Sequence, residues 1–316
     1  MGKHLGSICA VVMAFLLAAP TAPAQDAVHI VPLDITHGKP FVMLMVNGKG
    51  PFRFVVDTGT GAQAFITREL ADELGLPTVG HVNLFDPSGQ GGQKVPMVLI
   101  HSLRVAGVEF TDVKAPVHSL NFGEGDCQGL LGFTLFRQYL LTLDFPRRRM
   151  ELASGELAPD GGRSVLPFRM PDGIPVVSIA IGTTEIDAQL DTGGAGLSVP
   201  FNLASKLKFI SGPEDISNSE SLSTRFVLKG ATLGSNVQLG SFTFRHPFIE
   251  LNPAFPLANF GAWPLQNFAL TFDQKNALVR FDSDRHTLRL SATPEPVRLV
   301  NAPETRPTDM SLVPVG

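Results

Sequence analysis

The segment FRFVVDTGTGAQAFITRELADELGLP, residues 52–77, carries Asp57 at the end of an apolar stretch and directly before a Thr-Gly turn. Apart from Asp57, no charged residue lies between Arg53 and Arg68. A single Asp-Thr-Gly turn is a weak signal, because Asp often accepts hydrogen bonds from backbone N–H groups in turns. The reason for an unneutralised carboxylate at this place must therefore be sought elsewhere in the chain.

The motif occurs a second time in residues 186–210, IDAQLDTGGAGLSVPFNLASKLKFI, where Asp191 precedes Thr192 and Gly193. After each turn, apolar residues recur with helical spacing, which predicts a short amphipathic helix in each copy. The matched apolar positions are Leu70, Ala71, Leu74 and Leu76 in the first copy and Leu203, Ala204, Leu207 and Phe209 in the second.

The two copies also match near their ends, in residues 129–152 and 259–281. Each of these segments contains an apolar strand pattern, a four-residue polar turn (146–149 or 274–277) and a second strand pattern, which predicts a hairpin. Self-similarity of this kind indicates an internal duplication of one structural unit.

The rest of each copy consists of short segments with alternating apolar and polar residues, separated by Gly, Pro and Asn. This pattern predicts an all-β protein. We expect an N-terminal lobe over residues 25–153, a linker over 154–163, a C-terminal lobe over 164–286 and a Pro-rich tail over 287–316.

The first 24 residues have the pattern of a secretory signal, because Lys3 and His4 precede an apolar stretch and Ala22-Pro23-Ala24 is typical of a cleavage site. We expect cleavage after Ala24 and a periplasmic or secreted protein without a membrane span, since no later segment is long and apolar enough. The exported chain would keep one cysteine, Cys127, and so no internal disulfide, which favours a bacterial periplasm.

Several other functions are disfavoured by composition and motifs. The net charge is −4 and the only basic run is 147–149, so no nucleic-acid partner is expected. The histidines are dispersed and the motifs H-E-x-x-H and C-x-x-C are absent, so no metal site is expected. The motif G-x-S-x-G is also absent, so the nucleophilic serine turn of a hydrolase is not expected. Residues 59–64 match a dinucleotide loop, but the acidic residues at 72 and 73 fall on the predicted helix, so no cofactor is expected.

Two Asp-Thr-Gly turns in equivalent places of duplicated halves would meet at a pseudo-twofold axis. Two carboxylates about 3 Å apart do not both ionise readily, so they share one proton from acidic to near-neutral pH. The charged member can act as general base on a water held between them, while the protonated member donates to a carbonyl oxygen. The Gly permits close approach of the backbones and the Thr hydroxyl can bond to the other turn.

With these motifs the sequence resembles the aspartic peptidases, in particular the bacterial single-chain retropepsin-like aspartyl proteases, over roughly residues 30–282. The resemblance implies an all-β bilobal fold with two pseudo-twofold-related lobes, each with a short helix. It implies an aspartic endopeptidase, expected to be a monomer, that acts on peptides or proteins in extended conformation. It assigns Asp57 and Asp191 as the catalytic pair, supported by the active-site loop residues Thr58, Gly59, Thr60, Thr192 and Gly193.

Two departures from the family pattern distinguish the halves. In the family an apolar-apolar-Gly segment passes beside the active-site loop, and residues 130–132 fit this description. Residues 259–261 fit it only in part, because Asn259 stands in place of an apolar residue. Thr60 supplies a hydroxyl after the first Asp-Thr-Gly, whereas Gly194 supplies none after the second.

Residues 85–96, FDPSGQGGQKVP, have a Gly-rich tip that resembles the mobile flap of retroviral proteases. The residues assigned to this flap are Ser88, Gly89, Gly91 and Gly92. A plain surface hairpin is the alternative for this segment. Residues 208–230 of the second copy are polar and align poorly with the first, so a second flap is not assigned.

Two non-enzymatic alternatives remain open. The first is a catalytically silent peptide-binding protein that uses the interlobe cleft as a groove for an extended chain. The second is a periplasmic scaffold that uses a strand edge, with the aspartates purely structural. Retention of both Asp-Thr-Gly turns favours the enzyme over both alternatives.

Overall fold

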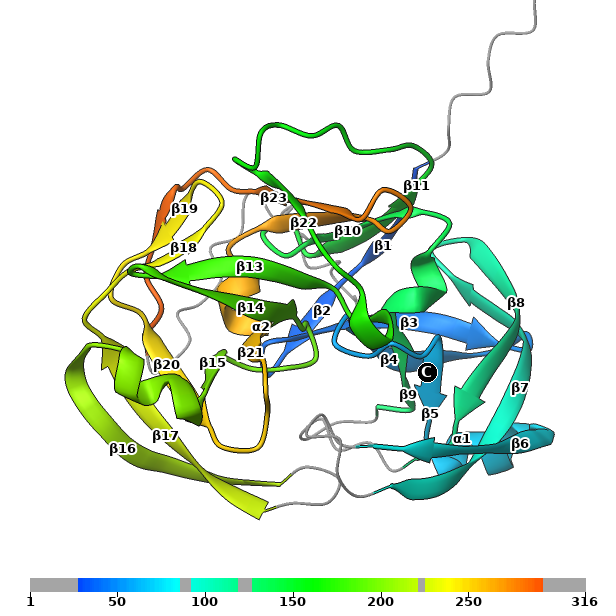
Figure 1. Ribbon diagram of the computed structural model, residues 1–316. Coiled ribbons are helices and arrows are strands. Elements are labelled where there is room, and N and C mark those ends of the chain that lie inside the picture. Colours follow the sequence, from blue (N-terminus) through cyan, green and yellow to red (C-terminus); the bar gives the residue numbers. More distant parts are fainter. Residues whose placement is uncertain (1–27, 86–91, 119–126, 221–224, 292–316) are drawn as a thin grey trace, which may run out of the picture.

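The computed structural model describes residues 28–85, 92–118, 127–220 and 225–291 (Figure 1). Strands predominate in this part of the chain, as the alternating sequence pattern predicts, and they form three sheets. Residues 1–27 and 292–316, which include the expected signal and most of the tail, lie outside the described residues.

The 8-stranded sheet is built from the N-terminal half of the chain. Its spatial order is β5 (Ala64–Ile66), β9 (Gly129–Gly132), β4 (Lys49–Asp57), β3 (Lys39–Val46), β7 (Gln93–Val105) and β6 (Thr78–Leu84), with β2 (Asp34–Thr36) beside β3 and β8 (Val108–Pro116) beside β7. The strand β4 ends at Asp57 and lies parallel to β9, so that Asp57 is opposite Gly132.

The 10-stranded sheet is built from the C-terminal half. Its order is β16 (Phe209–Glu220), β17 (Arg225–Leu233), β20 (Phe248–Asn252), β15 (Leu197–Pro200), β21 (Ala258–Phe260), β14 (Thr184–Leu190), β13 (Val176–Ile181), β18 (Val237–Leu239), β19 (Phe242–Phe244) and β24 (Thr287–Leu288). The strand β14 ends one residue before Asp191 and lies parallel to β21, as β4 lies parallel to β9.

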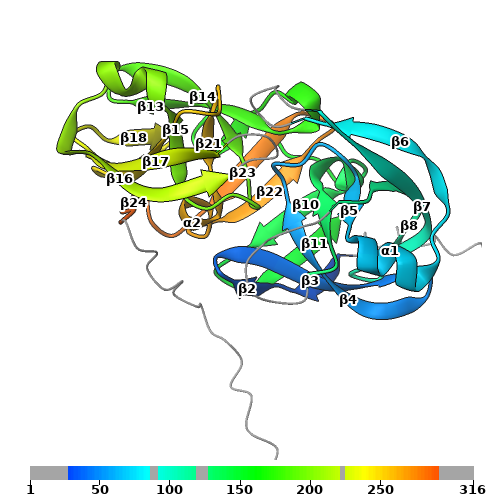
Figure 2. The ribbon, with the colours of Figure 1, turned by 90° about the horizontal axis from the view of Figure 1, so that it is seen from below.

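The 6-stranded sheet takes strands from both halves of the chain. Its order is β1 (His29–Pro32), β11 (Arg149–Ala153), β10 (Leu140–Asp144), β22 (Ala269–Asp273), β23 (Leu278–Asp282) and β12 (Val165–Pro167). At its centre β10 pairs antiparallel with β22, and the hydroxyls of Thr142 and Thr271 lie 2.9 Å apart. In both views this sheet lies between the other two (Figures 1 and 2).

The two predicted hairpins are β10–β11 and β22–β23. The second turn spans 274–277 as expected, whereas the first spans 145–148, one residue earlier than predicted. In the first hairpin β11 begins at Arg149, whose Nε lies 3.3 Å from the buried Asp144 carboxylate. The linker segment 154–163 contains neither helix nor strand, although the domain boundaries themselves stay predictions.

The helices after the two turns differ in kind. The first is α1 (Arg68–Leu74). It is capped at its start by Thr67, whose hydroxyl accepts from Leu70 N, and at its end by Gly75 in the left-handed conformation. The second is the 3-10 helix η3 (Phe201–Lys206), which has no side-chain cap because Pro200 precedes it. The short helix predicted for the second copy is therefore present, but it is a 3-10 helix that ends at Lys206, and Phe209 belongs to β16. Three further short helices are α2 (Ala262–Leu265), η1 (Phe133–Phe136) and η2 (Pro171–Gly173).

The polar segment 208–230, which could not be aligned from sequence, is mostly a long hairpin of β16 and β17. The pairing shifts register at three places, so the strands do not keep a simple apolar–polar alternation. The irregular alternation explains why the sequence pattern gave no clear strand signal here.

Candidate active site

The two Asp-Thr-Gly turns meet in the structure through their threonines, which are completely buried. Thr58 N donates to Thr192 Oγ1 at 3.1 Å, and Thr192 N donates to Thr58 Oγ1 at 3.1 Å. The hydroxyls donate in turn to the backbone across the interface, from Thr58 to Leu190 O at 2.7 Å and from Thr192 to Val56 O at 2.6 Å. Since an unsatisfied buried donor costs about 1–3 kcal/mol, this reciprocal set holds the two turns in one geometry.

The carboxyl groups of Asp57 and Asp191 lie against the glycine of the opposite turn. A Cβ atom on Gly59 would overlap the Asp191 carboxyl, and a Cβ atom on Gly193 would lie 2.5 Å from Asp57 Cγ. Each glycine also donates its N–H to the aspartate of its own turn, at 2.8 Å in the first turn and 2.9 Å in the second. The turns therefore bring the two carboxyls together at the junction of the two halves.

The outer oxygens of the two carboxyls are held differently. Thr60 Oγ1 donates to Asp57 Oδ2 at 2.9 Å. Gly194, the equivalent residue of the second turn, has no hydroxyl that could donate to Asp191. Its backbone N–H donates to Asp191 Oδ1 at 2.8 Å. Asn259 supplies the missing contact, since its Nδ2 donates to Asp191 Oδ2 at 2.6 Å. The sequence showed Asn259 only as a departure from an apolar position, and its role at the carboxylate was missed.

Burial and the neighbouring Asp191 carboxylate raise the pKa of Asp57 from 3.8 to about 7. Donation from Thr60 and Gly59 opposes this rise without cancelling it. Near neutral pH and below, Asp57 therefore keeps a proton that an exposed aspartate would lose. This is the one-proton arrangement that a pair of adjacent carboxyls adopts.

The raised pKa has a measurable effect on stability. Between pH 3.8 and about pH 7 the folded protein holds a proton on Asp57 that the unfolded chain has released, so the free energy of unfolding falls as the pH rises. An asparagine side chain at position 57 is neutral at every pH. The free energy of unfolding of Asp57→Asn at pH 8 is therefore expected to exceed that of the wild type by about 1–3 kcal/mol. Urea unfolding at pH 8 and pH 4 tests this, since the gain should shrink at pH 4, and an equal difference at both values would refute it.

The segments 130–132 and 259–261 lie beside the active-site loops, as expected from the sequence. Gly132 N donates to Gln63 O at 2.9 Å, and Gly261 N donates to Gly196 O at 2.9 Å. A Cβ on either glycine would overlap backbone atoms of the loop it touches, Ala62 in the first half and Ala195 in the second. Glycine is therefore required at both positions by close approach of backbone to backbone.

Of the residues assigned to the flap, Ser88, Gly89 and Gly91 lie outside the described residues. Gly92 is described, and a Cβ there would lie 3.1 Å from the Phe85 ring. The flanking strands β6 and β7 pair antiparallel, as a hairpin requires. The function of its tip stays a prediction.

Other reactive groups do not form a competing centre in the described part of the chain. Burial raises the pKa of the Cys127 thiol, and its Sγ donates to Gly129 O, so the neutral thiol is favoured over the thiolate. Over the described ranges no three His, Cys, Asp or Glu side chains are grouped as metal ligands would be. Nor does any described helix have the length and apolar character needed to span a membrane.

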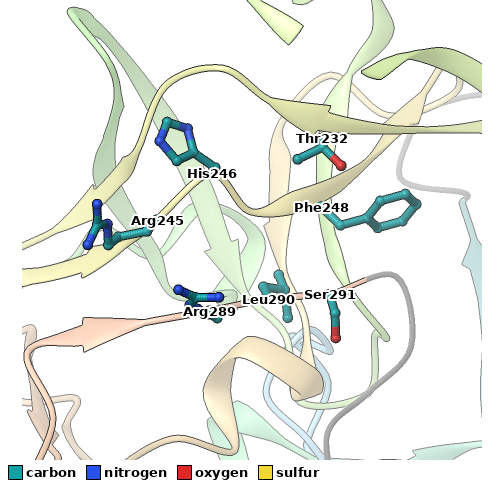
Figure 3. A pocket seen from close by; sticks show the side chains of 7 residues that line it. All are labelled: Thr232, Arg245, His246, Phe248, Arg289, Leu290 and Ser291. Carbon is teal, nitrogen blue, oxygen red and sulfur yellow. The ribbon is translucent and has the colours of Figure 1, made fainter. Parts of the chain in front are cut away.

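A surface pocket of about 480 Å³ lies at the edge of the C-terminal half (Figure 3). The residues that line it include the cationic or titratable side chains Arg245, His246 and Arg289. The lining contains no carboxylate and neither aspartate of the two turns, so this pocket has no acid–base pair. The two Asp-Thr-Gly turns, which bring two carboxyl groups together, are therefore the better candidate for an active site.

Residues 42–135 match the family model described as aspartyl protease. The matched segment contains the first Asp-Thr-Gly turn and the segment 130–132 that lies beside it, and it ends before Asp191. The match supports an aspartyl protease family for this chain. A comparison with curated proteins found no match.

Proposed function

We propose that the protein is an aspartic endopeptidase that hydrolyses peptide bonds by means of a water activated between Asp57 and Asp191. The observation that carries the proposal is the pair of carboxyls brought together by the reciprocal Thr58–Thr192 hydrogen bonds. A pair in which one pKa is strongly raised can supply both an acid and a base at one place.

The reaction proceeds without a covalent intermediate. The Asp191 carboxylate takes a proton from the water as its oxygen adds to the peptide carbonyl carbon, and protonated Asp57 gives its proton to the carbonyl oxygen. The tetrahedral intermediate then passes a proton to the amide nitrogen, the C–N bond breaks, and a carboxyl and an amine are released. Asp57 and Asp191 return to their one-proton state when a proton is redistributed between them.

The duplicated pairing around the turns supports a bilobal fold with a pseudo-twofold axis at the dyad. In the first half Asp57 ends β4, which is parallel to β9, and in the second half Asp191 follows β14, which is parallel to β21. We also propose export to the periplasm or outside the cell after removal of residues 1–24, and an extended peptide or protein as substrate.

The pH dependence of cleavage tests the proposed acid. Since Asp57 must be protonated and its pKa is about 7, kcat/KM is expected to fall about tenfold per pH unit above pH 7. Initial rates on an unfolded protein substrate between pH 3 and pH 9 would show this limb. Activity that keeps rising to pH 9 would contradict an acid of this kind.

The alternative is a peptide-binding protein with the same fold that does not cut. It predicts that peptides stay intact at every pH and are retained on the protein. Cleavage that follows the expected pH limb would exclude it.

A further inference from the structure

The contact between Asn259 and Asp191 has no counterpart in the first half of the chain. Leu130 lies opposite both Val55 on β4 and Phe65 on β5. Asn259 has the matching place in the second half, because it lies opposite Gln189 on β14 and Ser198 on β15. Partners across a sheet share one face, so these residues form equivalent rows beside the two turns.

The two rows differ in character at every position. The first half has the apolar residues Val55, Leu130 and Phe65, and the second half has the polar residues Gln189, Asn259 and Ser198. Glu250 on β20 extends the polar row, because it lies opposite Ser198. The polar residue at 259 is therefore part of a change from apolar to polar residues on three neighbouring strands.

The Asn259 amide occupies the space that a side chain on the second turn would need. A Cβ atom on Gly194 would lie 2.6 Å from Asn259 Nδ2 and 2.6 Å from Asp191 Oδ2. A threonine like Thr60 therefore cannot fit at 194 while Asn259 is present. The donor that the first half carries on its turn is carried in the second half by the neighbouring strand.

Ser198 lies beside the Asn259 amide without a hydrogen bond to it. Ser198 Oγ and Asn259 Oδ1 are both buried, and neither has a hydrogen-bond partner in the part of the chain that the structure describes. The two residues are directly opposite across β15 and β21. The NH₂ group of Asn259 is directed at Asp191 Oδ2, to which it donates.

We infer that Asn259 is a positioning residue that replaces the missing hydroxyl of the second turn and holds Asp191 as the ionised member of the dyad. The inference rests on the proposed function, since it assigns the charge within the same carboxyl pair. Asp191 accepts from three donors, Gly193 N, Gly194 N and Asn259 Nδ2, whereas Asp57 accepts from Gly59 N and Thr60 Oγ1. Donors to a carboxylate favour its ionised form, so the proton goes to Asp57.

Two titratable groups face this row in the described structure. Asp57 lies across the dyad, and the carboxyl of Glu250 lies on the other side, 3.1 Å from an ideal Cβ on Gly196. Burial raises the pKa of Glu250, which favours its neutral form beside the dyad.

Asn259→Leu gives the second half a leucine at the position that is equivalent to Leu130 in the first half. On the acid limb of the kcat/KM profile, activity falls with pH because the base takes up a proton. Without the amide donor this limb is expected to move up by about one pH unit, so activity at pH values below the limb falls about tenfold while activity above it changes little. A merely structural residue would lower activity at all pH values without moving the limb.

A control variant separates the contact with Asp191 from the general loss of an amide in this row. Gln189→Leu is the matched control, because it removes an amide of the same row that makes no hydrogen bond to Asp191 in the described structure. Its acid limb should stay at the wild-type pH.

Carbon-13 NMR of the aspartate carboxyls, recorded without substrate, separates this inference from the proposed function. The lower step of the dyad titration should move to higher pH in Asn259→Leu. If that step moves although no peptide is cut, the positioning role stands and the protease proposal fails. If peptides are cut but neither the NMR step nor the acid limb moves in Asn259→Leu, the positioning role is overturned.

Discussion

Asparagine in place of either Asp57 or Asp191 is expected to lower kcat/KM for peptide hydrolysis by about 10⁴-fold or more, because the two groups act as one unit. Asp57→Asn removes the acid that protonates the carbonyl oxygen. Asp191→Asn removes the base that takes the proton from water. The side-chain shape is kept in both variants, so the reciprocal hydrogen bonds of Thr58 and Thr192 remain available. Release of new amino termini from an unfolded substrate at pH 5 measures the loss.

An exposed aspartate gives the control for these substitutions. Asp72 lies on the solvent side of α1, and Asp72→Asn should cleave at the wild-type rate. Circular dichroism must show that all three variants are folded. Folded Asp57→Asn and Asp191→Asn proteins that cut as fast as Asp72→Asn would disprove the dyad.

Gly59→Ala is the second substitution with a large expected effect. The added methyl would overlap the carboxyl of Asp191, so that carboxyl or the turn must move. Displacement of a catalytic group by about 1 Å can reduce activity by about 10²-fold, and we expect a loss of kcat of at least this size. Steady-state kinetics on one peptide substrate would show the change in kcat.

Gly212 is suited as the control for this methyl group. It lies in β16, and a Cβ there would meet no atom within 4 Å. Gly212→Ala should therefore leave kcat at the wild-type value. If Gly59→Ala were as active as Gly212→Ala, the close approach of Gly59 to Asp191 would have no part in catalysis.

The pairing of the turns could be anticipated from sequence because it depends on local repeats. Two apolar strands that each deliver Asp-Thr-Gly predicted a meeting of Asp57 with Asp191, and the structure brings these residues together. The all-β character followed from the alternating pattern, and both β-hairpins near the ends of the repeats were found within one residue of the predicted place.

Other features depended on contacts that the sequence pattern does not contain. The hydrogen bond from Asn259 to Asp191 joins residues 68 positions apart, and only the register of β14 and β21 places them together. The β16–β17 hairpin shifts its register three times, which removes the regular alternation that a strand prediction needs. The second helix lacks a capping hydroxyl, since Pro200 stands where the first has Thr67.

The difference between Thr60 and Gly194 now has a physical meaning. From sequence it marked the two halves as chemically unequal, without showing what replaced the hydroxyl. In the structure Asn259 donates to the same side of Asp191. The two halves thus bind their carboxyls with different donors, which gives the proton of the dyad a preferred side.

The most direct test of the central claim is mass spectrometry of a mixed peptide library incubated at pH 5 with wild-type protein and, in parallel, with Asp191→Asn. The account predicts new peptide termini with the wild type and none above background with the variant. Intact peptides that are retained on the wild-type protein, or identical cleavage by the variant, would contradict it.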